Sequence, residues 1–132
     1  MANTYLRPPF LVGRIINPLM AALGAKPALA TRGRKTGQWR TVPVNVLERG
    51  GRRYLVSTRG DAFWVRNLRE SPEAELRRRG RTERVRAELV PESERPALIA
   101  AYVERWRGEA GQYFERLPDP ADHPVFELVP AG

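Results

Sequence analysis

The stretch VPVNVLERGGRRYLV, residues 42–56, has the pattern of a β-hairpin. Valines alternate with other residues over positions 42–46, which is typical of a strand with one buried face. Gly50 and Gly51 then supply a tight turn, and the apolar run 54–56 follows as the returning strand. The stretch therefore predicts two antiparallel strands joined by a glycine turn.

A second hairpin is predicted over residues 74–89, with its turn near Gly80. Between the two hairpins, residues 61–69 predict a short helix, because Trp64 and Leu68 lie four residues apart on one helical face. The outward positions of the second hairpin carry some combination of Arg77, Arg79, Arg81, Arg84 and Arg86.

Helices are also predicted outside the hairpin region. Residues 8–24 predict one or two short helices, with Asn17 as an N-cap and Pro18 at the first helical position. Their apolar face either packs over the core or contacts a membrane or a hydrophobic substrate. Residues 91–107 predict the clearest helix, with Ser93 as its cap. Its apolar face consists of Ile99, Tyr102, Val103 and Trp106.

The C-terminal part is predicted to add a short helix and a strand. Tyr113 and Phe114 lie in a helical piece after Gly108, and residues 125–129 alternate as a closing strand. Four or more strands with helices between and beyond them predict an α+β fold, with a small barrel as the form of the sheet. At 132 residues the chain is predicted to form a single domain.

The composition is that of a globular but strongly basic protein. Apolar residues make up 42% of the chain, charged residues 29%, and the net charge is +8. This charge favours an anionic partner, which could be a nucleic acid, a membrane surface or a polyanionic small molecule. Nearly all the cations are arginines, a bias that suits bidentate contacts with phosphate and carboxylate but equally fits a genome rich in G and C.

The scarcity of cysteine and histidine excludes several kinds of chemistry. The chain has no cysteine, so it has no disulfide and no thiol nucleophile. His123 is its single histidine, which argues against a Ser-His-Asp triad and against a histidine-rich metal centre. We expect a structural or surface role for His123 and no metal site. No apolar run is long enough to span a membrane and no secretory signal is evident, so a cytoplasmic location is expected.

The segment TRGRKTGQWR, residues 31–40, is the strongest indication of a binding site. It holds four cations, two glycines and no acid. Glycines allow a sharp turn that brings backbone N–H groups close to a ligand, and cations beside such a turn favour phosphate. The spacing matches neither a Walker loop nor a dinucleotide-binding fingerprint. A phosphate site and a solvated hairpin turn both remain open from these residues alone.

A second polar cluster, STRGDAFWVRNLR, occupies residues 57–69. Hydroxyls, a cation, a glycine and then a tryptophan beside an amide are the groups that a planar heterocycle with polar edges needs around it. Trp64 can equally be an anchor of the core.

Together the two clusters resemble the deazaflavin-dependent nitroreductase-like proteins of actinobacteria. The first motif of that family is matched in order by Thr31, Gly33, Arg34, Lys35, Thr36, Gly37, Arg40 and Pro43. The second motif is matched by Thr58, Arg59, Gly60, Trp64, Asn67 and Leu68. Arg32 and Trp39 depart from the usual first motif, and the tyrosine cluster that shapes the acceptor pocket in better-known members has no superposable equivalent here.

The resemblance implies a split β-barrel like that of flavin-binding oxidoreductases, with residues 1–27 as an N-terminal helical segment and residues 28–132 as the barrel and its helices. It also implies coenzyme F-420, an 8-hydroxy-5-deazaflavin with a phospholactyl-oligoglutamate tail; flavin mononucleotide is the alternative. By family likeness the phosphate and the start of the tail would be held by Arg34, Lys35, Thr36 and Arg40. Gly37 and Pro43 of the same motif would also belong to the cofactor-binding site. The ring would be lined by Ser57, Thr58 and Arg59 and closed in by Trp64 and Asn67.

The implied activity is hydride transfer to an electron-poor acceptor such as a quinone, a nitro compound or an activated alkene. The proton donor stays open between Thr58, Tyr102, Tyr113 and a water molecule. The rivals are a non-catalytic carrier of the deazaflavin or a flavin, a split barrel that holds haem, and a basic nucleic-acid-binding module, although no nucleic-acid partner is expected. A homodimer and peripheral membrane contact through the N-terminal helix are further expectations.

Overall fold

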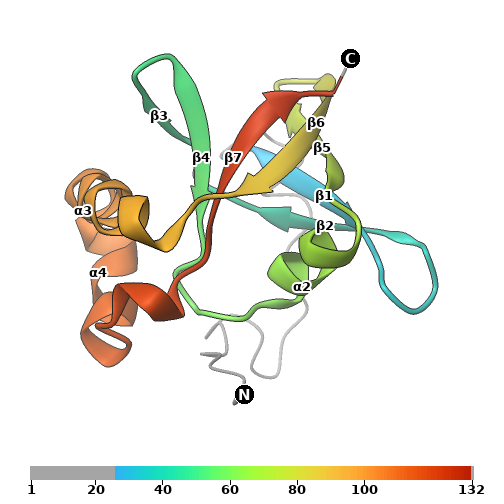
Figure 1. Ribbon diagram of the computed structural model, residues 1–132. Coiled ribbons are helices and arrows are strands. Elements are labelled where there is room, and N and C mark those ends of the chain that lie inside the picture. The colour runs from blue at the N-terminus through green and yellow to red at the C-terminus, as the bar shows by residue number, and fades with distance from the viewer. Residues whose placement is uncertain (1–25, 132) are drawn as a thin grey trace.

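The computed structural model describes residues 26–131, which form one antiparallel sheet with helices on both of its faces (Figure 1). The strands are β1 (Ala28–Arg32), β2 (Trp39–Pro43), β3 (Leu47–Arg49), β4 (Arg52–Val56), β5 (Glu73–Arg78), β6 (Arg81–Leu89) and β7 (Val125–Pro130). The helices are α2 (Phe63–Glu70), α3 (Arg95–Arg105) and α4 (Arg107–Arg116), with single 3-10 turns at η2 (Glu92–Glu94) and η3 (Pro120–Asp122).

The seven strands follow the order β2-β1-β5-β6-β7-β4-β3, and the sheet curls into the half-barrel of a split-barrel fold. The last strand in the sequence, β7, lies between β6 and β4 and pairs with both. The two outermost strands, β2 and β3, are therefore at opposite edges of the sheet, although they are neighbours in the sequence.

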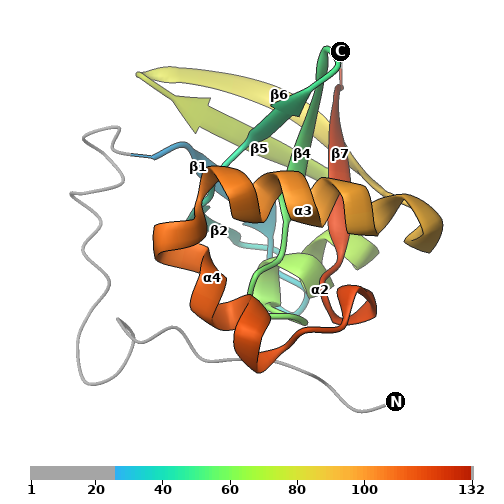
Figure 2. The same cartoon turned by 90° about the vertical axis from the view of Figure 1, so that its left-hand side faces the viewer.

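Two apolar clusters form the core, one on each face of the sheet. Leu55, Phe126 and Leu128 face the inside of the half-barrel, which α2 covers with Trp64 and Leu68. Alternate residues of the same strands face the other way and pack beneath α3 and α4, which Figure 2 shows side by side; this second cluster includes Tyr54, Val56, Val125, Ile99 and Tyr102. Because successive strand residues point to opposite faces, β4 and β7 are buried on both sides.

Most of the predicted elements are confirmed. The second hairpin is β5–β6, with a turn at Gly80, whose φ of +76° suits glycine. The short helix is α2, the two C-terminal helices are α3 and α4, and the closing strand is β7. The predicted N-terminal helices at 8–24 lie outside the described residues. The α+β class and the barrel form of the sheet are likewise confirmed.

The prediction that the valine strand at 42–46 pairs with 54–56 is wrong. β2 ends at Pro43, which has no N–H to continue a ladder, and it pairs with β1, a strand that was not predicted. The Gly50-Gly51 turn is confirmed, but it joins only the short β3 to β4. Residues 44–46 instead carry the chain from one edge of the sheet to the other.

The prediction that Ser93 caps the long helix is also wrong. Ser93 lies inside η2, α3 begins after it at Arg95, and neither helix start has a side-chain cap. The 3-10 turn η2 runs directly into the first turn of α3 and so begins this helical segment. Among residues 26–131, no helix has the length and apolar character needed to cross a bilayer.

Candidate functional site

A pocket of about 220 Å³ lies where β2 and β4 end, between α2 on one side and α3 and α4 on the other. The ends of the two strands and the loops that follow them contribute Pro43, Val44, Asn45, Leu55, Val56, Ser57, Thr58 and Arg59. The helices and the first described residue contribute Trp64, Tyr102, Glu109, Ala110, Tyr113 and Lys26. The pocket thus draws on segments from 26 to 113 and depends on the whole fold.

The loop after β4 forms one wall of the pocket and is held by buried hydrogen bonds. The Ser57 hydroxyl donates to the Gly60 carbonyl, and the Ser57 N–H donates to the Pro124 carbonyl at 2.9 Å. Gly60 has a φ of +83°, a conformation that lets the loop turn back towards α2. Because its hydroxyl already serves the loop, Ser57 shapes this wall of the pocket.

His123 also holds the loop after β4, through the carbonyl group of Ser57. Its side chain is completely buried, with Nδ1 2.7 Å from the Ser57 carbonyl oxygen and Nε2 2.5 Å from that of Leu117. The ring also stacks on Phe114, with centroids 4.2 Å apart. The structural role predicted for His123 is confirmed, and the residue lies in the interior rather than at the surface.

Arg59 extends from this loop into the pocket wall. Its guanidinium carbon lies 5.8 Å from the centre of the Tyr113 ring. The Arg59 Nε is buried and has no hydrogen-bond partner among the described residues. A buried N–H of this kind costs free energy unless an acceptor reaches it, so this wall suits a ligand with an oxygen at that point.

A polar network crosses the opposite side of the pocket. The Asn45 amide nitrogen lies 3.1 Å from the Tyr102 hydroxyl and 2.5 Å from Glu109 Oε1, and Glu109 also pairs with Lys26. Burial raises the pKa of Tyr102 to about 12, although the Asn45 hydrogen bond partly opposes this. Burial also favours a neutral Glu109, but the hydrogen bonds from Lys26 and Asn45 outweigh it and lower the pKa of that carboxyl.

The cationic segment 31–40 forms the hairpin turn between β1 and β2. The Gly33 N–H donates to the Gln38 carbonyl at 2.7 Å, and the Gly37 N–H donates to the Gly33 carbonyl at 3.0 Å. The Thr36 hydroxyl accepts from the Gln38 N–H at 3.2 Å, so it helps to close the turn. No acid among residues 26–131 forms an ion pair with the four cations of this segment, namely Arg32, Arg34, Lys35 and Arg40.

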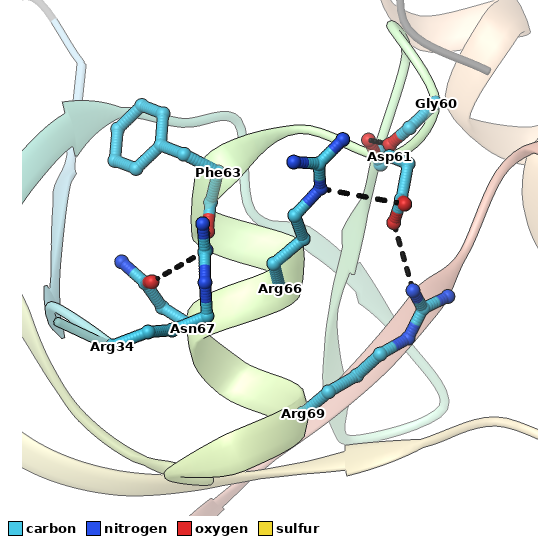
Figure 3. Close-up of polar contacts among 8 residues, drawn as sticks. Arg34, Gly60, Asp61, Phe63, Arg66, Asn67 and Arg69 are labelled. Atoms are coloured by element: carbon cyan, nitrogen blue, oxygen red, sulfur yellow. Dashed lines mark hydrogen bonds and ion pairs between the residues drawn. The ribbon is translucent and has the colours of Figure 1, made fainter. Parts of the chain in front are cut away.

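Arg34 and Asn67 hold this turn against α2 (Figure 3). Arg34 Nη1 donates to the Asn67 side-chain oxygen at 2.8 Å and to the Phe63 carbonyl at 3.2 Å. The Asn67 amide nitrogen in turn donates to the Thr31 hydroxyl at 3.0 Å. On the same helix, Arg66 and Arg69 pair with Asp61. The turn and α2 together therefore carry three neighbouring guanidinium groups, those of Arg34, Arg66 and Arg69.

The predicted site residues therefore fall into two groups. The pocket brings together Pro43, Ser57, Thr58, Arg59 and Trp64 with the candidate donors Tyr102 and Tyr113. The other predicted residues do not line it: Arg34, Lys35, Thr36, Gly37, Arg40 and Asn67. The two groups are connected by β2, since Pro43 is the third residue after Arg40 in the strand, a path of about 10 Å along an extended chain.

Asn45, Glu109 and Lys26 are pocket residues that sequence reasoning missed. A weak signal was present, because Asn45 interrupts an apolar run and Glu109 lies four residues before Tyr113, on the same helical face. Nothing in the sequence joins positions 45 and 109, which only the fold brings within hydrogen-bond distance. Among the described residues, no group of three or more histidine or acidic side chains could hold a metal ion.

Comparisons with known proteins give a consistent result. The family model for F420H2-dependent quinone reductase matches residues 12–117. No curated protein matches the chain. Among solved structures, an F420-H2-dependent reductase (FDR-A) aligns with a TM-score of 0.61 and 23% identity, over 78% of this chain and 92% of the other.

Two further structures share the fold. A protein of unknown function from Agrobacterium tumefaciens aligns with a TM-score of 0.62 and 20% identity, over 96% of this chain, which spans 60% of that protein. The haem storage protein HutZ from Vibrio cholerae aligns with a TM-score of 0.60 and 18% identity, over 90% of this chain and 92% of the other. At these identities the structural likeness concerns the fold alone.

Proposed function

Because this chain belongs to the F420H2-dependent quinone reductase family, we propose that it reduces a quinone, or another electron-poor acceptor such as a nitro compound or an activated alkene. The family match covers most of the chain and is the observation that carries the proposal. Family membership makes the chain an oxidoreductase with coenzyme F-420 as its cofactor. When bound, this coenzyme supplies a hydride, while the protein supplies binding, orientation and exclusion of water.

The side chains that line the pocket match a flat ring system with polar edges, such as that of the coenzyme. Trp64 supplies a flat apolar wall, and Thr58 and Arg59 supply a hydroxyl and a guanidinium group beside it. The unpartnered Nε of Arg59 offers a hydrogen bond to an oxygen at the edge of the ring or at the start of the tail. Ser57 acts through the loop that carries these two residues, and Pro43 also lines the pocket.

The acidic tail of the coenzyme fits the cations of the β1–β2 turn. Lys35 and Arg40 carry charges that no acid among residues 26–131 neutralises in an ion pair. Arg40 lies opposite Thr31 in the β1–β2 ladder, so both side chains are on the face of the hairpin where Asn67 of α2 lies. We assign the phosphate and the first glutamates to this turn, with Arg34 and Asn67 holding it in place.

Fluorescence titration of the purified protein with the oxidised coenzyme tests this assignment, with flavin mononucleotide as the comparison ligand. We expect micromolar binding of the deazaflavin and weaker binding of the flavin, followed by oxidation of the reduced coenzyme when menadione is added. Binding without turnover would identify a carrier. Binding of neither ligand, together with retention on DNA at moderate salt, would contradict the proposal.

The double variant Lys35→Ala/Arg40→Ala isolates the role of the turn. We expect coenzyme affinity to fall at least about 10-fold, because each charged hydrogen bond is worth roughly 1.5–3 kcal/mol. Arg81→Ala/Arg86→Ala removes two charges from the β5–β6 hairpin and serves as the matched control. Equal losses in the two variants would mean that only net charge matters, and the assignment of the tail to this turn would be wrong.

A cytoplasmic location, peripheral membrane contact through the N-terminal segment and a homodimer stay predictions from the sequence. Light scattering of the purified protein tests the dimer. Sedimentation with anionic vesicles, with and without residues 1–25, tests the membrane contact. These properties are independent of the assigned chemistry.

A further inference from the structure

In the hydrogen-bond network of Lys26, Glu109, Asn45 and Tyr102, the chemistry of each group decides which one donates and which one accepts. Glu109 is ionised at neutral pH, since its pKa lies below the usual range, and a carboxylate can only accept hydrogen bonds. The Asn45 side-chain atom 2.5 Å from Glu109 must therefore be the amide nitrogen, because an amide oxygen there would face the carboxylate oxygen. The ion pair with Lys26 keeps Glu109 in its charged form. Glu109 thus fixes which way the Asn45 amide points.

The orientation of Asn45 decides the role of the Tyr102 hydroxyl. The same amide nitrogen lies 3.1 Å from the Tyr102 oxygen and carries a second hydrogen to donate. The Tyr102 oxygen is thus an acceptor in this contact, and its own O–H must point elsewhere. No acceptor for that O–H is found among the described residues, and Tyr102 lines the pocket. That proton is therefore available to a molecule bound in the pocket that Tyr102 lines.

The other two candidate donors lack such an arrangement. Thr58 and Tyr113 also line the pocket, but no described residue forms a hydrogen bond that directs either hydroxyl. The face of the Tyr113 ring is engaged by Arg59. Burial holds the pKa of Tyr102 near 12, so its hydroxyl carries its proton throughout the neutral pH range.

We propose that Asn45, held by Glu109, is a positioning residue that makes Tyr102 the proton donor to the acceptor. The inference rests on the proposed reductase function. Reduction of a quinone requires one hydride and one proton: hydride addition leaves a hydroquinone monoanion, and the Tyr102 O–H bond breaks as its proton forms the second O–H of the hydroquinone. The tyrosinate then regains a proton from water, so that two electrons and two hydrogens have moved to the quinone.

The double variant Asn45→Asp/Glu109→Gln, or exchange variant, keeps the total charge but turns position 45 from a hydrogen-bond donor into an acceptor. The carboxylate at position 45 would accept from both Gln at 109 and the Tyr102 hydroxyl, which turns the Tyr102 proton away from the acceptor. We expect kcat with menadione to fall about 100-fold, in line with the usual contribution of general acid catalysis, while KM and coenzyme affinity change less than about threefold. The single variant Glu109→Gln, in which Asn45 can take either orientation, should lose an intermediate amount.

Tyr102→Phe is the companion variant. It should lower kcat as much as the exchange does, and adding it to the exchange should bring no further loss, because both remove the same proton. Unchanged kcat in either variant would overturn the proposal. A wild-type protein that binds the coenzyme but never turns over would instead contradict the reductase function itself.

A measurement without the coenzyme keeps the inference testable even if the exchange disturbs turnover for another reason. Difluorotyrosine placed at position 102 ionises at lower pH than tyrosine and can be followed by fluorine NMR. In the exchange variant the midpoint of ionisation should rise by about one pH unit, because the phenolate would face a carboxylate instead of an amide N–H. An unchanged midpoint would show that Asn45 does not direct this hydroxyl.

Discussion

Asn67 uses both ends of its amide within the protein. It is buried, accepts from Arg34 and donates to Thr31, and so joins α2 to the β1–β2 turn. The resemblance of its sequence motif to the family implies that Asn67 helps to enclose the coenzyme's ring, and this stays a prediction. The contacts described here instead indicate that Asn67 places the cations of the turn.

We expect Asn67→Leu to destabilise the protein by about 1–3 kcal/mol, because it leaves the buried Thr31 hydroxyl without its partner and removes the stronger of the two hydrogen bonds of Arg34. Urea unfolding followed by circular dichroism measures the loss. Thr31→Val, which removes only the weaker of the two hydrogen bonds, should cost less. Equal stability of wild type and Asn67→Leu would show that the amide does not fasten the turn.

The sequence motif after β4 predicted a group of pocket residues, while Pro43, Tyr102 and Tyr113 were predicted singly. Ser57, Thr58, Arg59 and Trp64 fall within one short segment, and all four line the pocket. Asn45 and Glu109 were missed because their pairing depends on where β2 ends and how α4 lies over the sheet. Such contacts are set by tertiary packing, which local patterns do not contain.

Elements held by local contacts were the most predictable. The β5–β6 hairpin closes through a glycine turn, and α2 shows its buried face through the spacing of Trp64 and Leu68. β1 was missed although its hairpin with β2 is local, because four of its five residues are buried and the strand shows no alternation of apolar and polar positions. The valine strand was misassigned because its alternation shows that one face is buried but cannot show which strand it pairs with.

The packing of α2 can be tested through Leu68, which is 1% exposed and faces the interior of the half-barrel. Leu68→Ala should lower the free energy of unfolding by about 2–5 kcal/mol, since it leaves a cavity beneath the helix. The exposed Glu70→Ala on the same helix is the control and should change it by less than about 0.5 kcal/mol. A loss confined to coenzyme binding, with stability intact, would argue against this packing role.

At the scale of the whole molecule, Arg53 and Glu83 connect β4 to β6 across the intervening β7. Two hydrogen bonds of 2.8 Å join the guanidinium group to the carboxylate. They lower the pKa of Glu83 below its ordinary value of 4.5, against the opposing effect of burial. A lowered pKa means that the pair stabilises the fold above pH 4.5, and that this contribution is lost as the pH falls through the folded-state pKa.

Glu83→Gln should therefore be less stable than wild type at pH 7, and the difference should shrink as the pH is lowered towards 3 and Glu83 is protonated. The difference at pH 7 should stay below about 1 kcal/mol, because the Glu83 side chain is 40% exposed and solvent screens the pair. Thermal unfolding of both proteins across this pH range provides the measurement. A difference that persists at pH 3 would assign the effect to packing rather than charge.

The central place of β7 has a consequence for how the protein is made. Residues 125–130 are the only strand that joins the β3–β4 pair to the remaining four strands, yet they leave the ribosome after all the other described strands. Until they emerge, β4 and β6 each present a bare edge, and such edges favour aggregation. A nascent chain that stalls before residue 125 should thus be a substrate for chaperones, however well its hairpins have already formed.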